Sequence, residues 1–81
     1  MAFDTLNRLK WTGKLGGAEI VIRHRGAPLE RRVIAGPKVT RIKRSHFYYE
    51  DGGRERFIPL HRVLLIRLEG KTIWKRSTGR G

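Results

Sequence analysis

A chain of 81 residues is long enough for one domain and too short for two. Its 19 Lys and Arg residues outnumber 7 Asp and Glu residues, which gives a formal net charge of +12 and indicates a nucleic-acid partner. The chain has no cysteine, which excludes disulfide bonds and thiolate chemistry, and its 3 histidines lead us to expect no metal site and no cofactor.

The first predicted element is a short helix over residues 3–11. Leu6 and Leu9 lie three residues apart, so they share one face of that helix. Gly13 follows directly and ends it. We expect this helix to pack its leucine face against the rest of the domain.

Six later segments are rich in β-branched or aromatic residues and are bounded by turn signals, so we predict them as strands. They cover residues 18–25, 29–35, 39–49, 55–58, 63–68 and 71–76. The third segment fits either one long strand or two short ones. Gly-Pro, Asp-Gly-Gly and Glu-Gly sequences supply tight turns between the segments.

These elements predict a mainly β (α+β) domain, with a short N-terminal helix followed by five or six strands. We expect the strands to form a strongly bent antiparallel sheet or a partly open small barrel, with the helix covering one end. Residues 1–76 make up the single domain, and residues 77–81 are expected to be a flexible basic tail.

Membrane insertion and secretion are not expected. The longest apolar run, residues 63–66, is too short to span a bilayer, and no segment pairs a basic face with a strong apolar face. Residues 1–5 lack a basic stretch before an apolar one, so we expect no signal peptide and a cytoplasmic protein. Few thermolabile residues among 32% charged residues are typical of a heat-loving organism.

Arginines beside a histidine form a first candidate phosphate contact. Thirteen of the cations are arginines, which can bind phosphate through two parallel hydrogen bonds. Arg23, His24 and Arg25 lie where a strand ends, before Gly26, whose missing side chain lets a phosphate approach the backbone. An ordinary basic strand with a half-buried His24 fits the same pattern equally well.

A second candidate contact is formed by His61 and Arg62. They follow Pro59, which turns the end of a strand into a corner. A corner exposes side chains at the mouth of a small barrel, where ligands often bind. The alternative is a histidine that hydrogen-bonds a neighbouring carbonyl group and fixes the corner, and we favour the binding role.

Aromatic side chains could add stacking contacts to these cations. Trp11 and Trp74 could stack on bases, and Trp11 is included in the predicted RNA interface, although in so small a domain the core is the simpler place for both. The aromatic residues 47–49 follow Arg44 and His46, and this stretch either contacts nucleic acid or forms a solvated strand face. The other basic residues of the predicted interface are Arg8, Lys10, Lys75 and Arg76.

Four segments match a known family; they are residues 6–11, 20–26, 58–63 and 70–76. The most specific are the Pro-x-His-Arg sequence at 59–62 and the Trp-x-Arg sequence at 74–76. Through them the chain resembles an uncharacterised archaeal protein family carrying the RNA cyclic group end recognition domain. That domain has been proposed, from genomic and domain associations, to recognise cyclic phosphate groups at RNA ends. Related domains in larger proteins adjoin RNA-repair and phosphoesterase domains.

Three functions remain open at this point. The first is a module that binds RNA 3′ ends bearing a phosphate or cyclic phosphate in RNA repair or processing, alongside RNA-repair enzymes. The second is a structural or ribosome-associated RNA-binding protein. The third is a metal-free RNA phosphodiesterase in which His24 and His61 act as general base and acid, and Arg62 stabilises the developing charge. Because no carboxylate is spaced to orient either histidine, we expect a binding protein rather than an enzyme.

Overall fold

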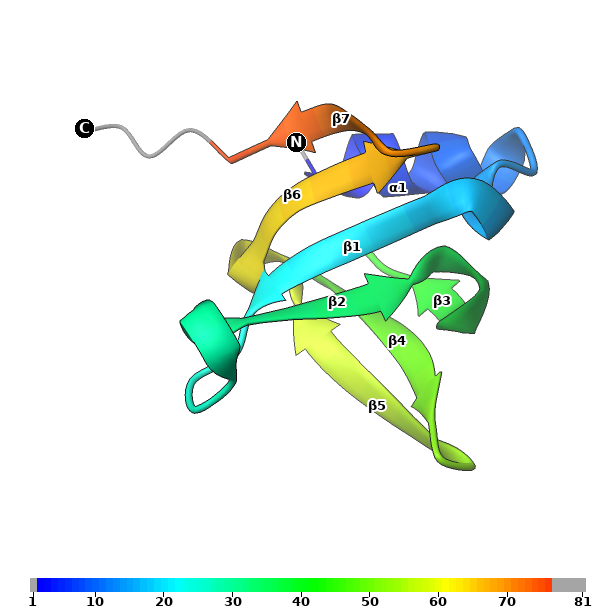
Figure 1. The fold of residues 1–81 in the computed structure, drawn as a ribbon. Helices are drawn as coiled ribbons and strands as arrows, with labels where there is room; N and C mark the ends of the chain where they lie inside the picture. The colour runs from blue at the N-terminus through cyan, green and yellow to red at the C-terminus, as the bar shows by residue number, and fades with distance from the viewer. Residues whose placement is uncertain (1, 77–81) are drawn as a thin grey trace.

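The computed structural model describes residues 2–76, and one α-helix, α1 (Ala2–Trp11), opens the fold (Figure 1). Its core-facing side chains recur at helical spacing; they are Ala2, Leu6 and Leu9. Gly13 ends the helix with a φ of 72°, which lets its N–H group and that of the next residue donate to carbonyl groups of the last turn. The helix predicted over residues 3–11 is confirmed.

Four strands form the first antiparallel sheet, in the order β2-β1-β6-β7 (Figure 1). Their bounds are Ala18–Arg23 for β1, Arg31–Ala35 for β2, Val63–Leu68 for β6 and Lys71–Lys75 for β7. The two central strands bring distant parts of the sequence together, since Ala18 pairs with Leu68. They also supply the largest share of the core, with Ile20, Ile22, Val63 and Ile66 fully buried.

Three strands form the second antiparallel sheet, in the order β3-β4-β5. Their bounds are Val39–Ile42 for β3, His46–Asp51 for β4 and Arg54–Pro59 for β5. Side chains alternate along β4, because successive residues of a strand point to opposite faces. Phe47 and Tyr49 are buried in the core shared with α1 and the first sheet, whereas Tyr48 points outward.

Two single-turn 3₁₀ helices, η3 (Gly36–Lys38) and η4 (Leu60–Arg62), carry the chain between the sheets. A proline accompanies each one, and its fixed φ and missing N–H group end the strand that precedes it. Leu60 is buried, and its N–H group donates to the Ser45 carbonyl oxygen at 2.9 Å. The η4 corner therefore lies where the two sheets meet.

The prediction of a mainly β domain with an N-terminal helix is confirmed, but the strands differ in number and arrangement. Residues 2–76 contain seven strands rather than five or six, because the segment 39–49 divides around residues 43–45. They form two sheets that do not close into a barrel within residues 2–76. The strand predicted over 29–35 starts only at Arg31, since residues 28–30 form a 3₁₀ turn with positive φ at Leu29 and Glu30.

The predicted tail, residues 77–81, lies outside the described residues. Across the part of the chain that the structure describes, no helix is long and apolar enough to cross a membrane.

Candidate functional site

A hollow of about 470 Å³, here called the cationic hollow, lies where the end of β1, the η4 corner and the end of β7 meet. Its lining consists of Arg23, Arg25, His61, Arg62, Leu64 and Arg76. All of these except the leucine were predicted from the sequence as RNA-binding residues. Arg25 lies in the turn after β1, because that strand ends at Arg23 rather than at the predicted residue 25. The fold thus gathers cations from three separate segments into one place.

Arg62 is anchored to the end of β1. Its Nε and Nη2 atoms donate to the carbonyl oxygen of Arg23 at 3.2 and 2.7 Å. A guanidinium group has five N–H donors, so these two contacts leave three for a ligand. Because the anchor holds this cation in place beforehand, binding an anion costs less side-chain entropy.

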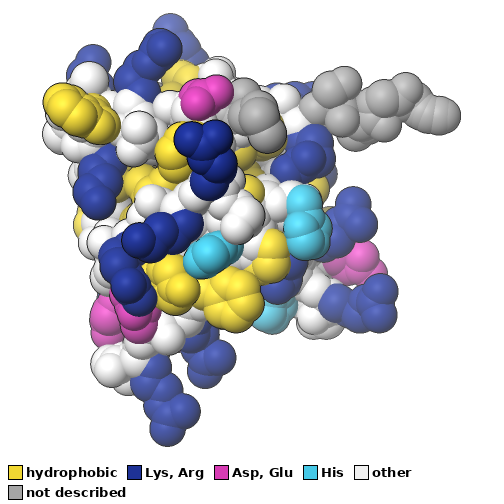
Figure 2. Space-filling view, turned by 180° about the vertical axis from the view of Figure 1, so that it is seen from behind, with side chains coloured by type: hydrophobic (Ala, Val, Ile, Leu, Met, Phe, Trp, Pro, Cys, Tyr) yellow, Lys and Arg dark blue, Asp and Glu magenta, His cyan; other side chains and the backbone are white. Residues whose placement is uncertain are grey.

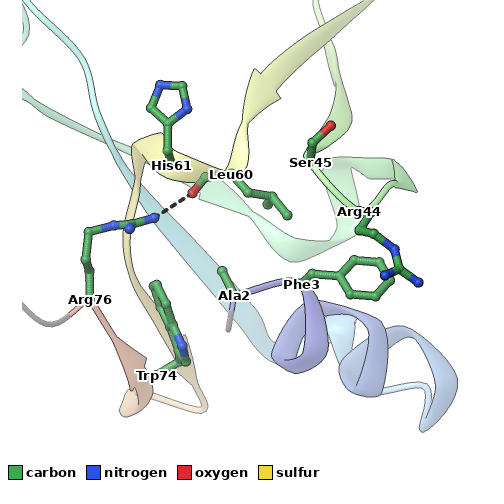
Figure 3. A pocket seen from close by; sticks show the side chains of 8 residues that line it. All are labelled: Ala2, Phe3, Arg44, Ser45, Leu60, His61, Trp74 and Arg76. Carbon is green, nitrogen blue, oxygen red and sulfur yellow. Dashed lines mark hydrogen bonds between the residues drawn. The ribbon is translucent and has the colours of Figure 1, made fainter.

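Arg76 anchors the η4 corner from the other side. Its Nε atom donates to the Val63 carbonyl oxygen at 2.9 Å, and its Nη2 atom donates to that of Leu60 at 2.8 Å (Figure 3). Its guanidinium carbon also lies 5.6 Å from the centre of the Trp74 ring, within the range of a cation–π contact. Arg76 therefore fixes the corner that carries His61 and still has three N–H donors to offer.

A second hollow of about 390 Å³, here called the apolar hollow, adjoins the cationic one (Figure 3). The two hollows share His61 and Arg76. The rest of its lining consists of Ala2, Phe3, Arg44, Ser45, Leu60 and Trp74. Figure 3 shows Ala2 between Phe3 and Trp74, and the Arg44 guanidinium carbon lies 5.9 Å from the centre of the Phe3 ring. Aromatic walls with cations at the rim suit a flat ring as a ligand.

Several carboxylates are paired away from both hollows. Near the tip of the β4–β5 hairpin, the Gly53 N–H group and Lys38 donate to Glu50 and lower the pKa of that carboxyl. Hydrogen bonds from Thr40 and Arg41 likewise lower the pKa of Glu55. No Asp or Glu among the described residues lines either hollow, so the cations there keep their positive field. Nor are three or more His, Asp or Glu side chains within residues 2–76 grouped so that they could hold a metal ion.

His24 lies outside both hollows. Its backbone N–H group donates to the Glu30 carbonyl oxygen at 2.8 Å, which fixes the turn after β1. Among the described lining residues, His61 alone supplies an imidazole. The phosphodiesterase hypothesis requires His24 and His61 at the same phosphate. The structure does not bring the two histidines together in either hollow.

Four further predicted residues lie elsewhere on the surface; they are Arg8, Lys10, Trp11 and Lys75. Trp11 is 83% exposed, so the expectation that it belongs to the core is wrong. It follows Leu9 by two residues, which places it on the opposite side of a helix that buries the Leu6 and Leu9 face. Trp74 is half-buried and lines the apolar hollow, as described above.

The aromatic stretch after residue 43 divides between two places. Arg44 lines the apolar hollow, whereas the His46 ring contacts Tyr48 and Phe57 on the outer face of the second sheet. Sequence reasoning missed Phe3, because an aromatic residue at the start of an amphipathic helix has the pattern of a core residue. The position of Phe3 in the apolar hollow is visible only in the folded structure, where Phe3 and Trp74 line the same hollow.

The fold and the two hollows define a small basic β domain with an arginine-rich cavity beside an aromatic one. The chain belongs to the family described as the MJ1316 RNA cyclic group end recognition domain, whose family model matches residues 1–76. The resemblance seen in the four segments is therefore confirmed.

Curated relatives come from archaea. A UPF0248 protein of Metallosphaera sedula is 35% identical over 78 residues, which cover 95% of this chain and 94% of that protein. A UPF0248 protein of Pyrobaculum islandicum is 37% identical over 75 residues, which cover 91% of this chain and 87% of that protein. No solved structure shows a significant match to the chain.

Proposed function

We propose that this chain binds RNA 3′ ends and recognises a terminal phosphate, a 2′,3′-cyclic phosphate in particular, in RNA repair or processing. The observation that carries the proposal is that the cationic and apolar hollows share His61 and Arg76. A terminal nucleotide joins a phosphate to a flat base, so two adjoining hollows of these kinds suit its two parts. The family description and the net charge of +12 support the same partner.

The cationic hollow supplies donors for phosphate oxygens. Arg62 and Arg76 are held by backbone carbonyl groups and keep unused N–H groups, while Arg23 and Arg25 are exposed and add charge. A cyclic phosphate carries one negative charge on two free oxygens, and hydrogen bonds to charged groups contribute about 1.5–3 kcal/mol each. His61 lies between the hollows, so we assign it to the ring of the cyclic phosphate, where phosphate and ribose join.

The apolar hollow supplies a stacking surface for the terminal base. Trp74 and Phe3 offer ring faces, and base–aromatic stacking contributes about 1–3 kcal/mol per base. Stacking tolerates any base, because every base has a π face. We therefore expect selectivity for the chemistry of the end and little preference for the identity of the last base.

Two other functions fit the charge of the chain but not the pairing of the hollows. A structural or ribosome-associated RNA-binding protein needs cations spread along a backbone track and does not require a cationic hollow beside an aromatic one. A phosphodiesterase needs an acid and a base at the reacting phosphate, and the described lining residues include a single histidine and no carboxylate. The geometry thus favours binding over catalysis.

The test compares one short oligonucleotide with three different 3′ ends: a 2′,3′-cyclic phosphate, a 3′-phosphate and a plain diol. We expect the cyclic end to bind at least about tenfold more tightly than the diol, a difference of roughly 1.4 kcal/mol. The 3′-phosphate carries more negative charge. If the cyclic end binds at least as tightly as the 3′-phosphate, the protein therefore recognises the shape of the end as well as its charge. Fluorescence anisotropy at fixed salt measures all three affinities.

Two variants sharpen this test. His61→Ala should remove the preference for the cyclic end and keep most of the affinity for the diol. Arg54→Ala is the matched control, because Arg54 is exposed at the start of β5, at the tip of the β4–β5 hairpin, and lines neither hollow. Equal affinity for the three ends would leave the structural RNA-binding protein as the better reading, and conversion of the cyclic end to a monophosphate would favour the enzyme.

A further inference from the structure

A cluster of rings, here called the aromatic patch, lies on the outer face of β4 and β5 and consists of the half-buried His46 and Tyr48 and the exposed Phe57. The His46 ring centre lies 5.2 Å from that of Tyr48 and 5.6 Å from that of Phe57, and the last two are 6.1 Å apart. Tyr48 and Phe57 are direct cross-strand partners, so the sheet itself sets their spacing.

Packing does not account for the patch. The alternate residues of the same strands, Phe47, Tyr49 and Ile58, are the ones that fill the core. Phe57 is 57% exposed on β5, which is an edge strand of its sheet. More than half of the Phe57 side chain is therefore open to solvent and available to a flat ligand.

The charges around the patch select nucleic acid as its occupant. The Arg41 guanidinium carbon lies 4.2 Å from the centre of the Tyr48 ring and is held there by Glu55, at 2.8 Å. Lys43 and Arg44 are exposed between β3 and β4. The nearest acids, Glu50 and Glu55, lie toward the hairpin tip and are occupied by Lys38 and Arg41. A polyanion with flat bases therefore finds cations at the end of the patch nearest residues 43–45 and carboxylates at the other end.

The patch is continuous with the site already described. Arg44 and Ser45 line the apolar hollow, and His46 is the next residue of the chain. The Ser45 carbonyl oxygen accepts a hydrogen bond from the Leu60 N–H group of the η4 corner, which ties the two regions together. Figure 2 shows histidine and hydrophobic side chains gathered on one face, with Lys and Arg side chains around them.

We propose that the aromatic patch binds the single-stranded RNA that leads to the bound 3′ end, with a base stacked on Phe57. This inference rests on the proposed function, because it takes the apolar hollow as the place of the last nucleotide. The Tyr48 and His46 rings contact the Phe57 ring, and the backbone phosphates pass over the exposed cations at residues 43–44 on the way to the cationic hollow.

The test uses two RNAs that carry the same cyclic end, a dinucleotide and an octanucleotide. We expect the longer RNA to bind more tightly to the unaltered protein. Phe57→Ala should lower the affinity for the octanucleotide by about tenfold, the usual effect of one lost stacking contact. The affinity for the dinucleotide should not change. Phe57→Trp should restore the binding. We expect both variants to fold, because the Phe57 side chain is more than half exposed.

Val33→Ala is the control, since Val33 is also an exposed apolar residue on a strand, and it lies outside the patch and both hollows. An unchanged affinity for the octanucleotide in Phe57→Ala would overturn the proposal, as would an equal loss for both RNAs. A change in oligomeric state without a change in RNA affinity would assign the patch to protein contacts instead. If the octanucleotide shows no end preference but still depends on Phe57, the patch stands and the end-recognition proposal fails.

Discussion

Arg62 and Arg76 each use part of one guanidinium group to hold backbone carbonyl oxygens, and both line the cationic hollow. The same side chain thus stabilises the fold and offers donors to a ligand. Arginine is suited to this double role because its five donors lie in a fixed plane, whereas lysine offers a single flexible ammonium group. These contacts connect the stability of the corner with the affinity of the site.

Arg62→Ala should therefore affect both stability and binding. We expect it to lower the free energy of unfolding by roughly 1 kcal/mol and to weaken RNA binding by roughly 1–3 kcal/mol. Arg62→Lys keeps the charge but loses the two-pronged contact with the Arg23 carbonyl oxygen, so it should recover only part of each loss. Urea denaturation and RNA titration measure the two effects. A variant with full stability and reduced affinity would show that the anchor adds nothing to the fold.

The corners η3 and η4 are the elements that turn a run of strands into two sheets. The η3 corner depends on a close approach between backbones, because a Cβ atom on Gly36 would meet the carbonyl oxygens of Leu15 and Ala18. Backbone atoms cannot rotate away as a side chain can, so this position admits only glycine without a shift of the chain.

Gly36→Ala should consequently destabilise the domain by about 1–3 kcal/mol or more. Gly16→Ala is a close control: Gly16 lies in the neighbouring turn, has no positive φ, and its added Cβ would meet nothing within 4 Å. Thermal or urea unfolding of the two variants gives the comparison. Equal stabilities would mean that the contact of η3 with residues 15–18 relaxes at no cost.

The whole molecule distributes its charges unevenly. The acids in ion pairs with described residues lie on the hairpin of the second sheet and on β1 at Glu19, while the hollows are lined by cations without a carboxylate among the described residues. Such separation leaves a positive surface on which several phosphates can bind at once.

Binding should therefore depend steeply on salt. If four to six phosphates are engaged, the logarithm of the binding constant should fall with the logarithm of the salt concentration at a slope of roughly −3 to −4 for a single strand. Removing one phosphate contact, as in Arg25→Ala, should make the slope shallower by about 0.7. Titrations of the octanucleotide at a series of salt concentrations measure this slope. A slope near zero would argue against RNA as the partner.

The sequence was sufficient for features that depend on neighbouring residues. Alternation predicted the strands, and Pro59 predicted the corner that carries His61 and Arg62. It was insufficient wherever distant segments meet. Phe3 and Trp74 form the apolar hollow only because β7 packs beside β6 in the same core as α1, and the role of Arg62 as an anchor depends on a carbonyl group 39 residues away.

The sharing of Arg76 and His61 has a consequence for how a nucleotide is sensed. The Val63 and Leu60 carbonyl oxygens hold the Arg76 guanidinium beside the Trp74 ring, so in the proposed function a base on that ring and a phosphate on that cation lie at a fixed spacing. Separate fragments would each pay their own association entropy, whereas a single nucleotide pays it once. Under the proposed function, the domain would therefore distinguish a base and a phosphate that belong to one terminal residue from the same groups on separate molecules.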